Sequence, residues 1–379
     1  MIYLDHNATT ALHPEVLKMM MPYLEAQYGN PTANHRFGRK ARSAIEDARE
    51  QVALSVNAHP SQVIFTASGS EANNMIIQGV AKSAPDTHFG FSSIEHPCIS
   101  RPIESLKSRG YLATKIPVDA AGEIQINNLS AADLKKINFI SCMAVNNETG
   151  VIQNLSEIVA TAKNHNIQVH SDAVQALGKI NVNFEDLGLD AMTISSHKIY
   201  GPQGIAALVM NKKIDLYPLI EGGGQERGLR SGTENLAAIV GFGKACERAH
   251  NNLVTYNDAL KKIQIFLESE LKKMGAIIFS EKVKRVANTT FFSIKGIDGV
   301  TLLTALDRLG YAVASGSACS SNNNEPSHVL LAMNIDEETA MSALRISLGI
   351  DTTLQNIKDF VAALKKEIER LKQLTAMAA

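Results

Sequence analysis

Two stretches of the chain, NIQVHSDAVQA (166–176) and DAMTISSHKIYGPQG (190–204), decide the fold class. Each begins with a short run that contains apolar residues and ends in polar residues. Short apolar runs bounded by turn signals predict strands buried in a sheet. The runs QVIFTA, THFGFSS and KINFISCMAV repeat this pattern, and longer helical patterns separate them. The alternation predicts an α/β domain with a mostly parallel sheet flanked by helices.

A second, smaller domain is expected where the alternation stops. A long helical stretch follows EGGGQERGLRSGTEN, and the strands beyond it, such as RVANTTFFSI and GYAVAS, are fewer and shorter. The chain closes with a charged amphipathic helix, TLQNIKDFVAALKKEIERLKQL. We therefore predict a large α/β domain at 13–255 and a small α+β domain formed by 1–12 and 256–379, with a long helix crossing the boundary.

The composition excludes several classes of protein. The 37 basic and 38 acidic residues are scattered and leave a net charge of −1, which argues against a nucleic-acid partner. No apolar run approaches the roughly 20 residues of a membrane helix, and the start MIYLDHNATT lacks the pattern of a secretory signal. The four cysteines are widely spaced without a CxxC pair, so we expect a cytoplasmic protein without disulfides or metal ligands.

Polar residues follow the strands of the predicted large domain. In open α/β sheets, ligands bind outside the carboxyl ends of the strands. Five successive strands that each deliver a hydrogen-bonding or titratable group to one edge therefore predict a ligand site. The residues just past these strand ends are Ser70, His96, Asn147, Asp172, Gln175, Ser195, His197 and Lys198.

The motif SGSEAN contains a candidate phosphate site. Gly69 and Ser70 lie between a strand and a helix, so the helix N-terminus would face an anion. The alternative is an ordinary helix cap made by Ser68 or Ser70. The motif is neither GxGxxG nor GxxxxGK[ST], which disfavours a Rossmann dinucleotide site and a P-loop.

The motif SSHKIYGPQG places Lys198 directly after an apolar strand. A lysine near a buried sheet edge can have a lowered pKa and form a Schiff base, although most lysines extend into solvent. Asp172 ends the preceding strand, where its carboxylate could pair with a protonated pyridine nitrogen. A Schiff-base lysine, this aspartate and a phosphate-binding helix N-terminus are the parts that pyridoxal phosphate requires.

The stretch VASGSACSSNNNEPS (313–327) places Cys319 among small and polar residues. Gly, Ser and Asn are typical of loops, so we expect this thiol to be exposed on a mobile loop. The stretch alone leaves open whether it is a chance surface cysteine or a reactive one.

Nine motifs, in order from the N-terminus to about Gly349, together resemble those of the cysteine desulfurases. They are YLDHNATT, GSEANN, EHPC, NNETG, HSDAVQA, SSHKIYGPQG, GGGQERGLRSGT, SGSACSS and RISLG. These enzymes are fold-type I pyridoxal-phosphate transferases that take sulfur from L-cysteine for iron–sulfur clusters and related products. The resemblance implies the same fold, pyridoxal 5′-phosphate as cofactor, and conversion of L-cysteine to L-alanine.

The resemblance also implies the catalytic residues. Lys198 matches the lysine that forms the Schiff base, and Cys319 matches the thiol that accepts sulfur as a persulfide. His96 matches the histidine that stacks on the pyridine ring and handles protons. Asp172 matches the partner of the pyridine nitrogen, and Gln175 matches the donor to the phenolic oxygen of the cofactor.

Further site residues follow from the same resemblance. Thr233 matches a residue that reaches the phosphate of the neighbouring subunit, which implies a homodimer with shared sites. Asn147 and Arg345 match groups near the substrate carboxylate. The phosphate-binding positions match Gly69, Ser70, Ser195 and His197.

Other functions stay open at this point. An aminotransferase or a selenocysteine lyase would use Lys198 and Asp172 equally well, but aminotransfer does not need the mobile Cys319. A catalytically silent scaffold should have lost Lys198 or Cys319. Some relatives carry a longer tail that helps to dock an iron–sulfur scaffold protein, whereas this sequence stops at LTAMAA, so the identity of the sulfur acceptor is open.

Overall fold

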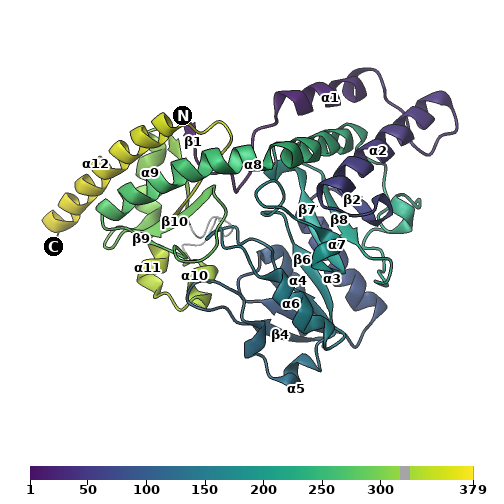
Figure 1. Cartoon of the computed structure of the whole chain (residues 1–379), viewed down its shortest axis with the longest axis horizontal. Coiled ribbons are helices and arrows are strands. Elements are labelled where there is room, and N and C mark those ends of the chain that lie inside the picture. Colours follow the sequence, from purple (N-terminus) through teal and green to yellow (C-terminus); the bar gives the residue numbers. More distant parts are fainter. Residues whose placement is uncertain (316–324, 379) are drawn as a thin grey trace.

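A seven-stranded sheet is the largest element of the computed structural model, which describes residues 1–315 and 325–378 (Figure 1). Its strand order is β2-β8-β7-β6-β5-β3-β4. Only β8 runs antiparallel to its two neighbours, and all other pairs are parallel. The predicted mostly parallel sheet is therefore confirmed. The strands are β2 (Val63–Thr66), β3 (His88–Ser92), β4 (Leu112–Ile116), β5 (Phe139–Ser141), β6 (Gln168–Asp172), β7 (Ala191–Ser195) and β8 (Ala206–Met210).

Helices cover both faces of this sheet. On one face α2 (Arg36–Ser55), α6 (Leu155–Lys163) and the first part of α8 (Leu236–Lys273) share a core with the strands. On the other face α3 (Gly69–Ser83) and α4 (Pro97–Ser108) do so. Successive residues of β5 alternate between the two cores, with Phe139 in the second and Ile140 in the first. A strand buried on both faces is a continuous apolar run, which is why the sequence pattern reveals these strands.

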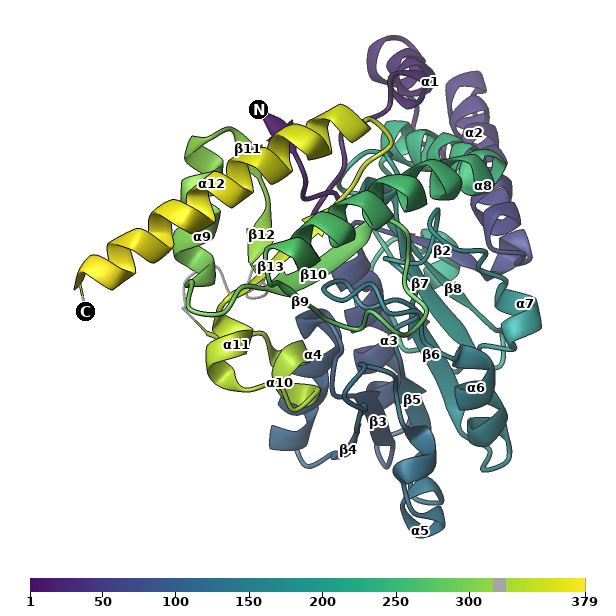
Figure 2. The ribbon, with the colours of Figure 1, turned by 60° about the vertical axis from the view of Figure 1, so that its left-hand side comes forward.

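A second, antiparallel sheet of four strands has the order β12-β13-β10-β9. It shares a core with α9, α12 and the far end of α8, and Figure 2 shows α8 and α12 passing over it. Its strands and the two further helices are β9 (Ile277–Ile278), β10 (Thr289–Ser293), β12 (Ala314–Ser315), β13 (Ala343–Ser347), α9 (Gly299–Arg308) and α12 (Leu354–Ala378).

The N-terminal segment joins the small sheet region rather than the large sheet. Its strand β1 (Ile2–Tyr3) pairs in parallel with β11 (Tyr311–Ala312), and Asp5 bridges to Ser347. The helix α1 (Pro14–Glu25) then packs against α8. The helix α8 spans the predicted boundary at residue 255, so the division of the chain at residues 12 and 255 stays a prediction.

Short helices complete the described part of the chain. Within the ranges 1–315 and 325–378, no helix combines the length and the apolar character needed to cross a bilayer. The short elements are α5 (Ala131–Leu134), α7 (Phe184–Leu187), α10 (His328–Ala332), α11 (Glu337–Met341) and the 3₁₀ turns η1 (Pro60–Gln62), η2 (Ile126–Asn128), η3 (Ser196–Lys198) and η4 (Glu226–Gly228).

Candidate active site

A cavity of about 320 Å³ lies at the carboxyl ends of the large-sheet strands. Parallel strands end at the same edge of a sheet, and this edge is where ligands bind in open α/β folds. Strand β13 of the small sheet adds Arg345 to the lining. The predicted cofactor and substrate residues that line the cavity are Gly69, Ser70, His96, Asn147, Asp172, Gln175, Ser195, His197, Lys198 and Arg345.

The N-terminus of α3 faces this cavity. Ser68 is the cap of the helix, since its side chain accepts a hydrogen bond of 3.1 Å from the backbone N–H of Glu71. The capping alternative is thereby resolved in favour of Ser68, and Ser70 is left in the first turn. A Cβ atom at Gly69 would lie 3.1 Å from Cγ2 of Val174, so the backbone approaches the next loop closely. Such a helix N-terminus favours an anion.

The hydroxyl of Ser195 supports an acceptor at the same place. Ser195 ends β7 with 1% of its surface exposed, and its Oγ has no hydrogen-bond partner among the described residues. Buried hydroxyls are normally hydrogen-bonded, so an unpartnered one that lines a cavity indicates a missing ligand group. The helix end and this hydroxyl form a cradle suited to phosphate oxygens.

Asp172 is held rigidly at the end of β6. Its Oδ2 accepts a hydrogen bond of 2.7 Å from Nδ2 of Asn73, and its Oδ1 accepts one of 2.9 Å from the backbone N–H of Val174. Only 7% of its surface is exposed. Both oxygens therefore have fixed positions on the cavity wall, which suits pairing with a protonated ring nitrogen.

His96 caps α4 and is neutral. Its Nδ1 accepts the backbone N–H of Cys98 at 3.2 Å, and the Cys98 thiol lies 2.9 Å from the same nitrogen. Because a backbone N–H can only donate, the neutral ring carries its proton on Nε2. Burial lowers the pKa of His96, although the charge of Asp172 opposes this shift.

Cys98 lines the cavity but is a poor nucleophile. Burial, and then the charge of Asp172, raises the pKa of its thiol to about 12. Its Sγ accepts a hydrogen bond of 3.0 Å from Nδ2 of Asn73, the amide that also binds Asp172. The thiol is the less nucleophilic form, so Cys98 orients His96 rather than attacking a substrate.

Lys198 lies in η3, directly after β7. Its Nζ donates to the backbone carbonyl oxygens of Asn7 at 2.5 Å and of Ala8 at 2.6 Å. The adjacent His197 binds the same segment, because its carbonyl accepts from the N–H and the hydroxyl of Thr10. Burial, and then the charge of Lys198, lowers the pKa of His197 to about 4. The N-terminal segment thus forms one wall of the site.

Arg345 enters the cavity from the small sheet. Its Nη2 forms an ion pair of 2.6 Å with Oδ1 of Asp5, and its Nη1 donates to the backbone carbonyl of Asn147 at 3.0 Å. Arg345 is 4% exposed, and its Nε has no hydrogen-bond partner among the described residues. The guanidinium is therefore fixed in place with one buried donor that can bind a ligand.

Two predicted residues are not placed in this cavity. Thr233 is exposed and lines a different pocket together with Thr66 and Glu226, so within one chain it does not meet Lys198. Its role toward a neighbouring subunit stays a prediction. Cys319 lies outside the described residues, and its position relative to the cavity is not assigned.

Comparisons with known proteins assign the fold to a family. A family model described as aminotransferase class-V matches residues 2–360. The chain belongs to this family. Among class-V relatives, the cysteine desulfurase IscS of Dictyoglomus turgidum is 39% identical over 99% of this chain and 96% of its own length. The mitochondrial cysteine desulfurase of Arabidopsis thaliana is 37% identical over 99% of this chain and 84% of its own.

Solved structures give the same assignment. The NifS-like protein from Rickettsia africae matches with a TM-score of 0.90 and 36% identity over 97% of this class-V chain and 99% of its own. A structure described as SspA in complex with cysteine matches with a TM-score of 0.81 and 32% identity, over 92% of this chain and 99% of its own. The predicted resemblance to the cysteine desulfurases and the fold-type I class are confirmed.

Several side chains of this class-V site are not predicted by the sequence. Asn73 lies in the motif GSEANN and Cys98 in EHPC, and both motifs carry the resemblance without implying a role for these positions. Asn7, in YLDHNATT, binds Lys198 and Gln175 through its carbonyl. Membership of a motif is the signal that could identify these residues, but the partners of Asn73 and Asn7 lie far away in the sequence.

Proposed function

We propose that this class-V protein is a pyridoxal-phosphate-dependent cysteine desulfurase that converts L-cysteine to L-alanine. The observation that carries the proposal is the cavity in which Lys198, Asp172 and the N-terminus of α3 meet. Relatives named cysteine desulfurase align with 99% of the chain, which supports the choice of reaction.

The residues that are present fit pyridoxal phosphate. The α3 N-terminus and the Ser195 hydroxyl would hold its phosphate, Asp172 its pyridine nitrogen, and Gln175 its phenolic oxygen. When bound, the cofactor withdraws electrons from the substrate carbon. Lys198 would bind it covalently through Nζ.

Proton transfer falls to Lys198 in this arrangement. The Nδ1 atom of His96 already accepts from the backbone N–H of Cys98, and its Nε2 carries the proton of the neutral ring. His96 lines the cavity but therefore has no ring nitrogen available to accept a proton. The Lys198 amine would accept a proton at Nζ, and the carbonyl oxygens of Asn7 and Ala8 would stabilise its protonated form. We therefore assign proton exchange to Lys198 and orientation to His96.

The sulfur leaves the substrate through a thiol of the enzyme. In the balanced reaction, the C–S bond of L-cysteine is replaced by a C–H bond, and the S–H bond of the enzyme thiol by an S–S bond. The products are L-alanine and an enzyme persulfide, which we assign to Cys319 because of the motif SGSACSS. A sulfur-acceptor or iron–sulfur scaffold protein would then take the sulfur.

The decisive experiment measures products from L-cysteine. Purified protein, reconstituted with pyridoxal phosphate and supplied with a thiol reductant, should release alanine and sulfide in equal amounts. Transfer of the amino group to a keto acid without sulfide release would instead support an aminotransferase. Incubation with L-alanine in place of L-cysteine serves as the control, since it offers no sulfur.

The Nε donor of Arg345, which has no partner in the described part of the chain, predicts a role in substrate binding. Replacing Arg345 by lysine removes this donor and the planar guanidinium, so we expect the KM for L-cysteine to rise about tenfold or more. The affinity for pyridoxal phosphate should change little, as measured by absorption titration.

The control for this prediction is Arg285→Lys. The side chain of Arg285 is also largely buried and pairs with Glu268 at 2.9 Å. Its Nε has no partner among the described residues, but Arg285 does not line the cavity. Its replacement should leave the KM unchanged. An unchanged KM in Arg345→Lys would remove the substrate role of Arg345.

We further propose a homodimer with shared sites. Thr233 is exposed and lies outside the cavity of its own chain, as expected of a residue that serves a second subunit. The helix α1 exposes Leu17, Met19 and Leu24, an apolar surface that a second copy would bury.

The described cysteines are unpaired thiols, which supports the proposed cytoplasmic location.

A further inference from the structure

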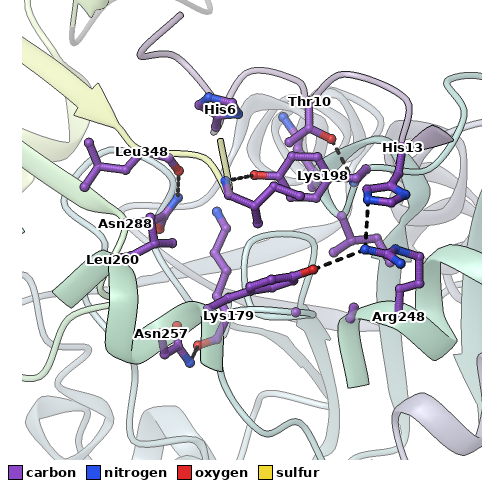
Figure 3. Close-up of a pocket in the computed structure, with 16 residues that line it drawn as sticks. His6, Thr10, His13, Lys179, Lys198, Arg248, Asn257, Leu260, Asn288 and Leu348 are labelled. Atoms are coloured by element: carbon purple, nitrogen blue, oxygen red, sulfur yellow. Dashed lines mark hydrogen bonds between the residues drawn. The ribbon is translucent and has the colours of Figure 1, made fainter. Parts of the chain in front are cut away.

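Lys198 lines a second, smaller cavity in addition to the proposed active site. This cavity has a volume of about 50 Å³ and is enclosed by the N-terminal segment, α8 and the loop that follows β6. Figure 3 shows the side chain of Lys179 extending through it toward His6 and Asn288. The sequence motifs imply no role for Lys179, and it is the feature of this cavity that calls for an explanation.

The local backbone directs Lys179 into the cavity. The preceding Gly178 has a φ of +74°, and a Cβ atom there would lie 2.8 Å from Cγ2 of Ile199, so the turn requires glycine. The carbonyl of Lys179 accepts a hydrogen bond of 2.7 Å from Nδ2 of Asn257 on α8. The turn is therefore fixed at both its φ angle and its carbonyl, and the side chain points back toward Gln175.

The amine of Lys179 determines the orientation of Gln175. Its Nζ donates to Oε1 of Gln175 and, at 2.7 Å, to Oδ1 of Asn7. Because Nζ of Lys179 donates to both oxygens, each of them is an acceptor. The carboxamide nitrogen of Gln175 therefore points away from the Lys179 amine. That nitrogen donates to the backbone carbonyl of Asn7 at 2.9 Å, and Gln175 lines the larger cavity.

The same contact holds the N-terminal segment in place. Asn7 binds Lys179 through its side chain and Lys198 through its carbonyl, so one residue connects the two amines. Its Oδ1 also accepts 3.0 Å from Nδ2 of Asn288, and its Nδ2 donates at 2.9 Å to the hydroxyl of Thr289. Loss of the Lys179 contact would therefore loosen the wall that carries the Lys198 acceptors.

Lys179 occupies a costly position for a cation. Its described hydrogen-bond partners are amide oxygens, and no ion pair with a carboxylate is found for it in residues 1–315 and 325–378. Burial, followed by the charges of Lys198 and Arg345, lowers the pKa of Lys179 well below the ordinary lysine value. A buried amine without a carboxylate destabilises the fold unless its hydrogen bonds compensate.

We propose that Lys179 is a positioning residue of the active site, which orients the Gln175 carboxamide toward the cofactor and fixes Asn7 against Lys198. The proposal rests on the proposed function, since it assumes that the larger cavity binds pyridoxal phosphate. It adds a residue that need not touch the cofactor and that acts through two hydrogen-bond acceptors.

The test compares Lys179→Met with the wild-type holoenzyme. Methionine has nearly the length of lysine but cannot donate, so the dissociation constant of pyridoxal phosphate should rise about tenfold, the effect of one lost hydrogen bond. The visible circular dichroism of the bound cofactor should also change, because it reports the orientation of the groups around the ring. Lys179→Arg keeps hydrogen-bond donors at this position and should restore both properties.

A matched control exists in the same chain. Lys261 donates to Oε1 of the buried Gln264 at 2.9 Å, which is also a lysine–glutamine pair, but it lies on α8 and lines neither cavity. Lys261→Met should leave cofactor affinity and circular dichroism unchanged. A double-mutant cycle with Gln175→Leu should show that Lys179→Met has little further effect on the spectrum once Gln175 is lost.

Defined results would overturn the proposal. A folded Lys179→Met protein with unchanged affinity and spectrum would do so, as would an equal loss in Lys261→Met. If Lys179→Met does not fold, Lys179→Arg decides, and a tenfold loss of affinity in the folded variant would contradict the proposal. These measurements need no turnover, so a protein that binds pyridoxal phosphate but releases no alanine would refute only the proposed function.

Discussion

Replacing Lys198 by alanine should reduce the release of alanine and sulfide from L-cysteine by at least about a thousandfold. The variant loses the amine that binds the cofactor covalently and the group to which we assign proton exchange. The neighbouring amine of Lys179 cannot replace it, because it is already bound to Asn7 and Gln175. The fold should persist, since the Lys198 amine binds two carbonyls at the edge of the cavity rather than a core side chain.

The attachment site can be measured directly. Borohydride reduction of the wild-type holoenzyme, followed by peptide mapping, should place the cofactor on the peptide that contains Lys198. Lys107→Ala, a replacement of an exposed lysine that pairs with Glu104, is the control and should keep full activity. Cofactor on a different lysine, or normal turnover in Lys198→Ala, would contradict the assignment.

Replacing Cys319 by alanine should abolish persulfide formation while cofactor binding is kept. The variant retains Lys198, Asp172 and the α3 N-terminus, so pyridoxal phosphate should bind and its absorption should change when L-cysteine is added. Without a thiolate to attack the substrate sulfur, the C–S bond should stay intact and almost no alanine should form. The measurement is transfer of radioactive sulfur from cysteine to protein, with peptide mapping of the label.

The other three cysteines, which differ in burial, serve as controls. Cys98 lines the cavity, but its pKa of about 12 keeps the thiol protonated, so Cys98→Ala should still form the persulfide. Cys142 and Cys246 are fully buried, and burial raises the pKa of both thiols. Label on Cys98, or undiminished alanine release from Cys319→Ala, would show that the sulfur takes another route.

The strand ends of the large sheet can be predicted because their signals are local. Each of β6 and β7 is a short run followed at once by polar residues, so the sequence alone identifies Asp172 and Lys198 as neighbours. The antiparallel β8 is not predicted, because only the 3₁₀ turn η3 and a Gly-Pro-Gln-Gly stretch, and no α-helix, separate it from β7, which breaks the expected alternation. The edge strand β4 is not predicted either, because most of its residues are at least partly exposed and do not form a continuous apolar run.

The interior of the site cannot be predicted in the same way, because its contacts join distant parts of the sequence. Lys179 binds Asn7 across 172 positions, and Asn73 binds Asp172 across 99. Neither the length of an apolar run nor the spacing of polar residues predicts which lysine places its side chain inside a cavity. The resemblance to a family supplies the roles of Gln175 and Arg345, whereas the hydrogen bonds that orient them depend on the tertiary fold.

The contacts of Asn7 have a consequence for protein synthesis. Its backbone N–H is bound by Ser347, which follows 340 residues later, and its side chain by Asn288. Translation proceeds at about 5–20 residues per second, so roughly 20–70 s pass between the synthesis of Asn7 and the synthesis of Ser347. The wall that holds Lys198 therefore forms only after Ser347 has been translated, so the cofactor site is completed well after most of its own residues have been made.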